Sequence, residues 1–154
     1  MAVPVSYPAV WDDQAFYPLH EEDDVSEIPP HRRWVTYLYN ALEARFPAWF
    51  VTSNVLIYWE PGDQKACRAP DLLVVREPLA EAVDRVYQTW KQPPVIFVAE
   101  IGSRSTFQVD EGPKVEIYQD LVQAAEYYYA NPPQGDQRLW RLGPDGYERV
   151  APEA

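Results

Sequence analysis

The sequence predicts a mixed-sheet domain of the α/β or α+β class, with helices packed against the sheet. Three features lead to this prediction. A helical pattern follows Pro29-Pro30, a nearly uninterrupted apolar run covers Val95–Ile101, and a second helical pattern begins at Pro113. Segments rich in Val, Ile, Tyr and Trp lie between and after the helical patterns, so helices and strands alternate along the chain.

The composition is that of one folded domain. The chain has 154 residues, of which 47% are hydrophobic and 24% are charged, and this length can bury a core without disulfides. No apolar run approaches the roughly 18 residues of a membrane span, and the first residues lack the pattern of a signal peptide. The single cysteine, Cys67, excludes an internal disulfide and a cysteine-based zinc site. We therefore expect a packed thiol, a cytoplasmic location and no membrane partner.

The net charge of −11 limits the partners that the chain can bind. General affinity for nucleic acid normally requires a basic face, so the overall charge counts against it. A local cationic site, or a site at which divalent metal ions supply the positive charge, stays open. Aromatic residues make up 14% of the chain, which permits a large core and also an aromatic interface, as in a homodimer.

The chain divides into an acidic arm, residues 1–28, and a single domain, residues 29–154. A helix is predicted over His31–Phe46, because proline suits the first helical turn. His31 begins this helix on its apolar side, where a packed or hydrogen-bonded histidine and a ligand are both open. The apolar stripe of the helix consists of Val35, Leu38, Leu42 and Phe46.

Strands are predicted over Trp49–Trp59 and Pro70–Arg76, separated by a turn at Pro61-Gly62-Asp63. Asp71 stands at the entrance of the second strand. It is either a common strand-entry aspartate or a functional acid. Residues 77–94 are interpreted as a polar connection, a loop or an irregular helix. A third strand, buried on both faces, is predicted over Val95–Ile101.

Glu100 lies inside this third strand, and a buried carboxylate is costly unless a metal or a cation compensates it. The following loop carries hydroxyl groups and one arginine. Its residues Ser103, Arg104 and Ser105 suit either an anion or the capping of local backbone.

The helix after Pro113 is predicted to carry its apolar stripe as far as Tyr128/Tyr129. Lys114, Tyr118 and Leu121 share one face of it, which directs the lysine stem inward. A lysine at a helix N-terminus needs a negative partner, and Glu100 is a plausible one. Asp110 precedes the helix as a capping residue.

The last strands are predicted as a hairpin, Arg138–Leu142 with Tyr147–Val150, joined by Gly143-Pro144-Asp145-Gly146.

Asp71, Glu100 and Lys114 form a candidate site for hydrolysis of a phosphodiester bond. Two carboxylates on neighbouring strands can hold Mg²⁺ or Mn²⁺. A nearby ammonium can orient the attacking water or stabilise charge on phosphorus. The spacing of these residues does not by itself distinguish such a site from a structural lysine–glutamate pair.

The chain resembles the Uma-two, or "putative restriction endonuclease", domain family of the PD-(D/E)XK nuclease superfamily. The resemblance covers roughly residues 28–150 and implies a restriction-endonuclease-like core, a mixed sheet flanked by helices. The matching segments are WFVTSNVLIYW, APDLLVV, FVAEIGSRST, Asp110-x-x-x-Lys114 with Tyr118, and AEYYYANP followed by LWRLGPDGY.

The resemblance identifies Pro70-Asp71 with the PD element and Glu100 with the (D/E) element. The superfamily's lysine normally stands two residues after that acid, where this chain has Gly102. The role of that lysine is then expected to pass to Lys114. Further departures from the family pattern lie in the loop and at the helix end: Phe107, Asn131 and Gln123-Ala124-Ala125.

The resemblance implies a Mg²⁺- or Mn²⁺-dependent DNA endonuclease. Asp71 and Glu100 would be metal ligands, joined by the backbone carbonyl of Ile101, and Lys114 would position or activate the water. The loop hydroxyls and Arg104 would contact substrate phosphate, while supporting roles would fall to His31, Asp110 and Tyr118.

The alternative is a nuclease fold without nuclease activity, kept as a binding or assembly module. The aromatic content, the acidic charge and Phe107 favour this alternative. In either case a homodimer is expected, since two-fold symmetry lets two sites face one duplex.

Overall fold

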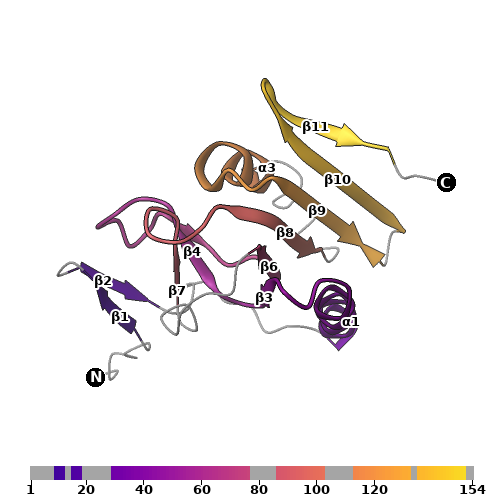
Figure 1. The fold of residues 1–154 in the computed structure, drawn as a ribbon, viewed down its shortest axis with the longest axis horizontal. Coiled ribbons are helices and arrows are strands. Elements are labelled where there is room, and N and C mark those ends of the chain that lie inside the picture. Colours follow the sequence, from indigo (N-terminus) through magenta and orange to yellow (C-terminus); the bar gives the residue numbers. More distant parts are fainter. Residues whose placement is uncertain are drawn as a thin grey trace, which may run out of the picture.

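A computed structural model describes residues 9–12, 15–18, 29–76, 86–102, 113–132 and 135–151. Helices and strands together form the predicted mixed α+β fold (Figure 1). The elements in chain order are β1 (Ala9–Asp12), β2 (Ala15–Pro18), α1 (Pro29–Arg45), β3 (Phe50–Thr52), β4 (Leu56–Tyr58), β5 (Cys67–Arg68), β6 (Leu72–Val75), β7 (Val86–Gln88), β8 (Val95–Ile101), α3 (Pro113–Glu116), the π-helical segment η2 (Ile117–Val122), β9 (Glu126–Asn131), β10 (Asp136–Gly143) and β11 (Gly146–Val150).

A six-stranded sheet in the order β11-β10-β9-β8-β6-β3 forms the centre of the domain. The pair β8–β9 is parallel, and the other neighbours are antiparallel, so the sheet is mixed as predicted. A second sheet has the order β5-β4-β7, and β1 pairs with β2 inside the predicted arm.

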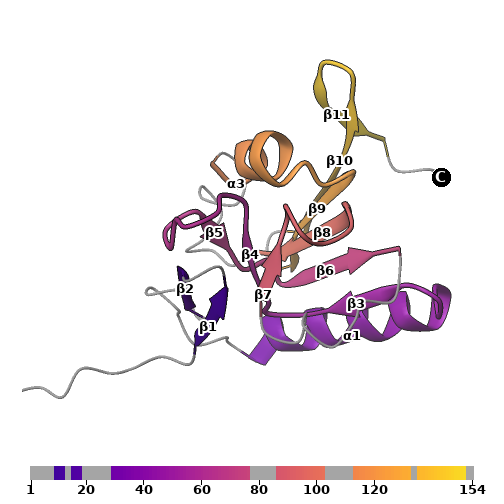
Figure 2. The same cartoon turned by 60° about the vertical axis from the view of Figure 1, so that its left-hand side comes forward.

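Helical segments cover the two faces of the main sheet (Figure 2). The apolar side of α1 packs on one face, where Val35 joins a buried cluster with Leu72, Ala99 and Ile101. On the other face, η2 places Tyr118 in the largest buried cluster, which also includes residues of β8, β9 and β10. β8 therefore lies between two layers, and its apolar run is explained by burial on both sides.

One of the predicted strands is divided into two in the structure. The prediction of one strand over Trp49–Trp59 was wrong, because the chain breaks at Asn54, whose φ is +55°. Asparagine adopts this left-handed conformation more readily than most residues. The break moves the chain from β3 in the main sheet to β4 in the second sheet.

The polar connection predicted for residues 77–94 contains a strand that the sequence did not reveal. β7 pairs in parallel with β4, and all three of its residues are buried. Tyr87 is fully buried, and its hydroxyl donates to the carbonyl of Pro93. The short strand is too brief for a visible period, so tertiary burial decides its conformation. Residues 77–85 lie outside the described residues.

The helix that begins at Pro113 is shorter than predicted. It ends at Val122, since Gln123 takes the left-handed conformation with φ +58°. Tyr128 and Tyr129, which we had assigned to the helical stripe, belong to β9 instead. The run of aromatic residues favours a strand, and its contacts with β8 and β10 stabilise one here.

Other predicted elements occur in the structure. β8 has the predicted bounds, and β10 with β11 form the hairpin, whose closing pair is Gly143 and Gly146. Three members of the predicted stripe, Val35, Leu38 and Leu42, pack from α1, whereas Phe46 lies beyond the end of the helix. Cys67 is a buried free thiol packed with Leu56 and Tyr58. No described helix is long and apolar enough to cross a membrane.

The left-handed residue at the end of η2 permits a test of the fold. Gln123→Gly should raise the free energy of unfolding by up to about 1 kcal/mol, because glycine adopts positive φ without steric cost. Gln123→Val should lower it by a similar amount or more. Denaturant titration of both variants checks the prediction, and equal stabilities would contradict the assigned backbone conformation.

Candidate active site

The two predicted acids come together at one end of the β6–β8 pair. Leu72 is paired with Ala99 in the antiparallel register, and one residue further along are Asp71 and Glu100. Asp71 Oδ2 accepts a hydrogen bond of 2.6 Å from the backbone N–H of Ile101, the residue that follows Glu100. This bond holds the Asp71 carboxylate against the end of β8.

Glu100 is 3% exposed, and two groups from the next helical segment compensate its charge. Lys114 Nζ lies 3.2 Å from Glu100 Oε2. The hydroxyl of Tyr118 donates to Glu100 Oε1 at 2.5 Å. The predicted inward direction of Lys114 is therefore confirmed. Leu121 is not on this buried face, because it is 47% exposed while Val122 is buried instead.

The change of face between Leu121 and Val122 follows from the wider turn of η2. A π-helix contains more residues per turn than an α-helix, so each buried position shifts along the sequence. Lys114 and Tyr118 still share one face as predicted, because the π-helical segment begins only at Ile117.

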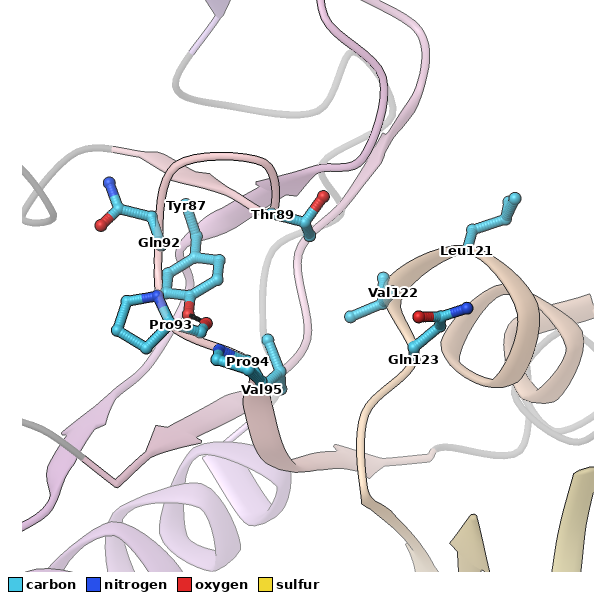
Figure 3. Close-up of a pocket in the computed structure, with 9 residues that line it drawn as sticks. All are labelled: Tyr87, Thr89, Gln92, Pro93, Pro94, Val95, Leu121, Val122 and Gln123. Carbon is cyan, nitrogen blue, oxygen red and sulfur yellow. Dashed lines mark hydrogen bonds between the residues drawn. The ribbon is translucent and has the colours of Figure 1, made fainter. Parts of the chain in front are cut away.

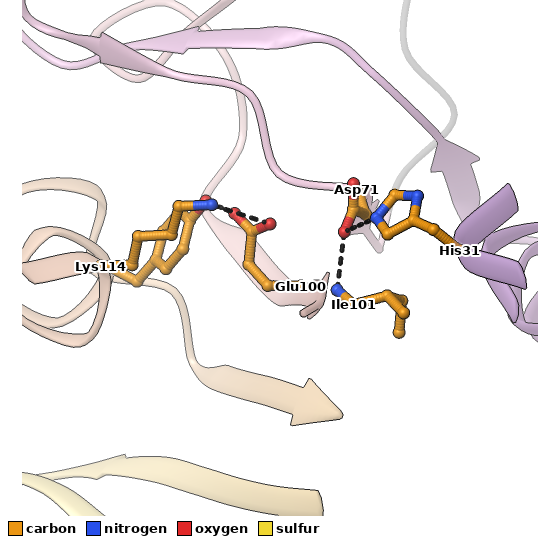
Figure 4. Close-up of polar contacts among 6 residues, drawn as sticks. His31, Asp71, Glu100, Ile101 and Lys114 are labelled. Atoms are coloured by element: carbon orange, nitrogen blue, oxygen red, sulfur yellow. Dashed lines mark hydrogen bonds and ion pairs between the residues drawn. The ribbon is translucent and has the colours of Figure 1, made fainter. Parts of the chain in front are cut away.

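His31 supports the other acid from the opposite helix. Its Nε2 lies 3.0 Å from Asp71 Oδ2, close enough to donate a hydrogen bond. Figure 4 shows Lys114 and His31 approaching from opposite sides, with Glu100 and Asp71 between them. His31 is thus hydrogen-bonded in the structure, and its alternative role as a ligand stays a prediction. Both contacts of Asp71 use Oδ2, so Oδ1 takes part in neither of them.

The structure also explains why no lysine stands two residues after Glu100. A Cβ atom built on Gly102 would lie 2.5 Å from the hydroxyl oxygen of Tyr129 and 2.7 Å from its ring. The Tyr129 ring thus fills the space that a side chain at position 102 would need. A lysine must reach Glu100 from elsewhere, and Lys114 does so.

The sequence reasoning did not identify Tyr129 as part of the site. Its partner in the parallel register is Glu100, which places both side chains on the same face of the sheet. Asn131 follows on that face, fully buried, and its Nδ2 donates to the Tyr129 hydroxyl at 3.2 Å. Reading Tyr127, Tyr129 and Asn131 as alternate positions of a strand would have provided the signal.

Tyr118 is a neutral hydrogen-bond donor in this site. Burial first, and then the charge of Glu100, raise the pKa of Tyr118 well above its ordinary value. The phenol therefore keeps its proton at every pH near neutrality and cannot act as a base. Its role is to orient the Glu100 carboxylate.

Four residues proposed for the site lie outside the described residues: Ser103, Arg104, Ser105 and Asp110. Phe107, which departs from the family pattern, also lies there. Their roles stay predictions.

A separate pocket of about 230 Å³ lies at the other end of β8 (Figure 3). Val95, the first residue of β8, lines it, whereas Glu100 stands near the last residue of the strand. The pocket is therefore not part of the acidic site. Its lining residues are Tyr87, Thr89, Gln92, Pro93, Pro94, Val95, Leu121, Val122 and Gln123.

The domain thus has a mixed sheet between helices, two acids at neighbouring strand ends, and a lysine beside one of them. The model of the Uma2 family, described as "Putative restriction endonuclease", matches residues 23–154. The chain therefore belongs to the Uma2 family, as its sequence motifs indicated. No curated protein matches the chain.

The close approach of Gly102 and Tyr129 gives a prediction. Gly102→Ala should lower the free energy of unfolding by about 1–3 kcal/mol, because the added methyl group overpacks the site. Combining it with Tyr129→Leu, which removes the crowding ring atoms, should cost less than the sum of the two single changes. A double-mutant cycle by denaturant titration measures this coupling. Additive costs would contradict the steric explanation.

A second prediction concerns Tyr118 and pH. Because burial raises the pKa of Tyr118 in the folded state, the unfolded chain releases this proton first as the pH rises above about 10. The contribution of Tyr118 to stability is complete below that pH and is lost above it. Tyr118→Phe should make the decline of the melting temperature with rising alkaline pH shallower. Part of the decline remains, because burial also raises the pKa values of Tyr87 and Tyr147.

The same variant should also lose about 1.5–3 kcal/mol of stability at neutral pH, the value of a hydrogen bond to a charged group. An unchanged alkaline slope would contradict the buried Tyr118–Glu100 pair.

Proposed function

We propose that the chain is a Mg²⁺- or Mn²⁺-dependent DNA endonuclease that hydrolyses phosphodiester bonds at Asp71 and Glu100. The observation that carries this proposal is the buried Glu100 carboxylate, which pairs with Lys114. The next residue, Ile101, donates its backbone N–H to the Asp71 carboxylate. Membership of a family described as restriction endonucleases supports DNA as the substrate.

The donor atoms fit a hard divalent cation. Mg²⁺ is commonly bound by one or two carboxylates, with water and substrate phosphates completing its shell. Asp71 and Glu100 would hold it, and the Ile101 carbonyl is the proposed third protein ligand. No group of three or more His, Cys, Asp and Glu side chains suited to a metal occurs among the described residues. Backbone, water and substrate oxygens would complete the shell in this proposal.

A bound divalent ion would lower the pKa of water and neutralise charge on the phosphate. The residues of the chain prepare the site for this chemistry. Lys114 places an ammonium beside Glu100, where it can orient a water molecule or stabilise developing negative charge. Tyr118 and His31 hold the two carboxylates in position, since each makes a hydrogen bond to one of them.

The phosphate contacts proposed for Ser103, Arg104 and Ser105 belong to the same hypothesis, as does capping by Asp110. These residues follow β8 directly or precede α3, so they connect the two elements that carry Glu100 and Lys114.

Cleavage of plasmid DNA with Mg²⁺ or Mn²⁺ tests the proposal. Asp71→Asn, Glu100→Gln and Lys114→Ala should each reduce the rate at least about 100-fold, the usual effect of removing a positioned catalytic group. Asp120→Asn is the matched control, since Asp120 is an exposed acid on the same helical segment as Tyr118. Circular dichroism confirms that each variant folds. Undiminished cleavage by all three site variants would contradict the assignment.

A second candidate function is that of a binding or assembly module that forms a homodimer. The observation that favours it is a pair of exposed aromatic rings on α1. Trp34 is 42% exposed and Tyr37 is 65% exposed, and their rings meet edge to face with centroids 6.2 Å apart. Aromatic residues of this kind are enriched in protein interfaces.

Sedimentation equilibrium tests the dimer that this candidate requires, and titration with Mn²⁺, which only the nuclease should bind, separates the two functions. A dimer that is converted to a monomer by Trp34→Ala with Tyr37→Ala, but not by Leu121→Ala at an exposed apolar residue elsewhere, would support it. A monomeric wild-type chain would contradict it.

A further inference from the structure

The sheet face that carries Glu100 continues across the hairpin of β10 and β11. The register pairs Glu100 with Tyr129 on β9, and Tyr129 with Arg138 on β10. Trp140, two residues after Arg138 on β10, is paired with Arg149 on β11. Residues directly opposite one another in a sheet, and residues two apart in one strand, point to the same face. Arg138 and Arg149 therefore lie on the same face as the candidate active site.

These arginines lie within reach of one substrate. Neighbouring strands are about 4.8 Å apart, so β10 is about 10 Å and β11 about 14 Å from β8. A nucleic-acid strand with one phosphate at the two acids would extend over this distance within a few nucleotides. The arginines and the acids thus lie on the same face of the sheet, with β9 between their strands.

This face of the hairpin carries two arginines. Arg149 is exposed, its guanidinium carbon lies 5.4 Å from the centre of the Trp140 ring, and no carboxylate of the described residues forms an ion pair with it. Arg138 lies 3.1 Å from Asp136. Exposed Arg149 therefore adds a positive charge to this face, in a chain whose net charge is −11.

The two guanidinium groups influence each other. Burial first, and then the charge of Arg149, lower the pKa of Arg138. Two like charges held near one another on a protein surface favour an anion that contacts both of them. A bidentate arginine contact to phosphate is the usual form of such recognition.

We propose that Arg138 and Arg149 form a phosphate-contact site for the backbone of the nucleic-acid substrate, on the side of β8 away from Asp71. This inference rests on the proposed function, because it takes nucleic acid as the ligand of the neighbouring acids. The contact is to phosphate and carries no sequence information of its own.

The hairpin contains a matched control. Arg141 lies on β10 between Trp140 and Leu142 and points to the opposite face, where Glu126 lies 3.5 Å away. Its side chain is 62% exposed. Arg141→Gln changes the net charge by the same amount as Arg149→Gln, but on the face away from the site.

The test is the binding of a short fluorescent DNA duplex to the full chain in EDTA, so that metal-dependent cleavage does not occur. Arg149→Gln should weaken binding about tenfold at low salt and reduce the slope of log K against log salt by about 1, the value for one lost phosphate contact. Arg149→Lys should retain the slope. Arg141→Gln should bind within about twofold of wild type.

The outcomes separate this inference from the proposed function. Wild-type affinity and slope in both Arg149→Gln and Arg138→Gln would overturn the phosphate site, as would a wild-type chain that does not bind the duplex. An equal loss in Arg141→Gln would also overturn it, because only net charge would then matter. A chain that binds through Arg149 but never cleaves DNA would contradict the proposed function and leave the phosphate site standing.

Discussion

The structure depends on how one buried carboxylate is accommodated. Glu100 lies in the central strand β8 with only 3% of its surface exposed, and an unpaired charge there would be costly. Lys114 and Tyr118 bind its two oxygens from the same helical segment. The charge of Glu100 therefore helps to fix the position of that segment against the sheet. It also helps to fix the packing of Tyr118 on Tyr127, whose ring centroids are 5.0 Å apart.

The second carboxylate is held by a different kind of contact. Asp71 accepts from the backbone of Ile101 and lies beside His31, so its position depends on the β6–β8 edge and on the start of α1. Each acid thus also has a contact from a different helical layer, His31 of α1 for Asp71 and the segment of α3 and η2 for Glu100. The ring of Tyr129 closes the space beside Gly102, which leaves Lys114 as the cation at Glu100. This arrangement explains why Lys114, fourteen positions after Glu100 in the sequence, is the lysine that pairs with it.

Sequence patterns predicted those parts of the fold that local chemistry determines. The apolar run of β8, most of the stripe of α1 and the Gly-Pro-Asp-Gly turn of the last hairpin each contain their own signal. The spacing of Lys114 and Tyr118 indicated that the lysine stem points inward, and the structure places it at Glu100. The break at Asn54, the strand β7 and the early end of η2 had no such signal. Each depends on one backbone conformation or on burial by distant segments, which a local pattern does not contain. The contact between His31 and Asp71 joins residues 40 positions apart and was missed for the same reason.

The central claim is that Asp71 and Glu100 together bind one divalent metal ion. Anomalous scattering from crystals grown with Mn²⁺ tests it most directly, because it locates the ion without reference to activity. The account predicts one Mn²⁺ within bonding distance of both carboxylates, with Lys114 beside them, and no ion at this position in Glu100→Gln. A Mn²⁺-containing crystal in which the ion binds elsewhere, while Lys114 still pairs with Glu100, would contradict the account.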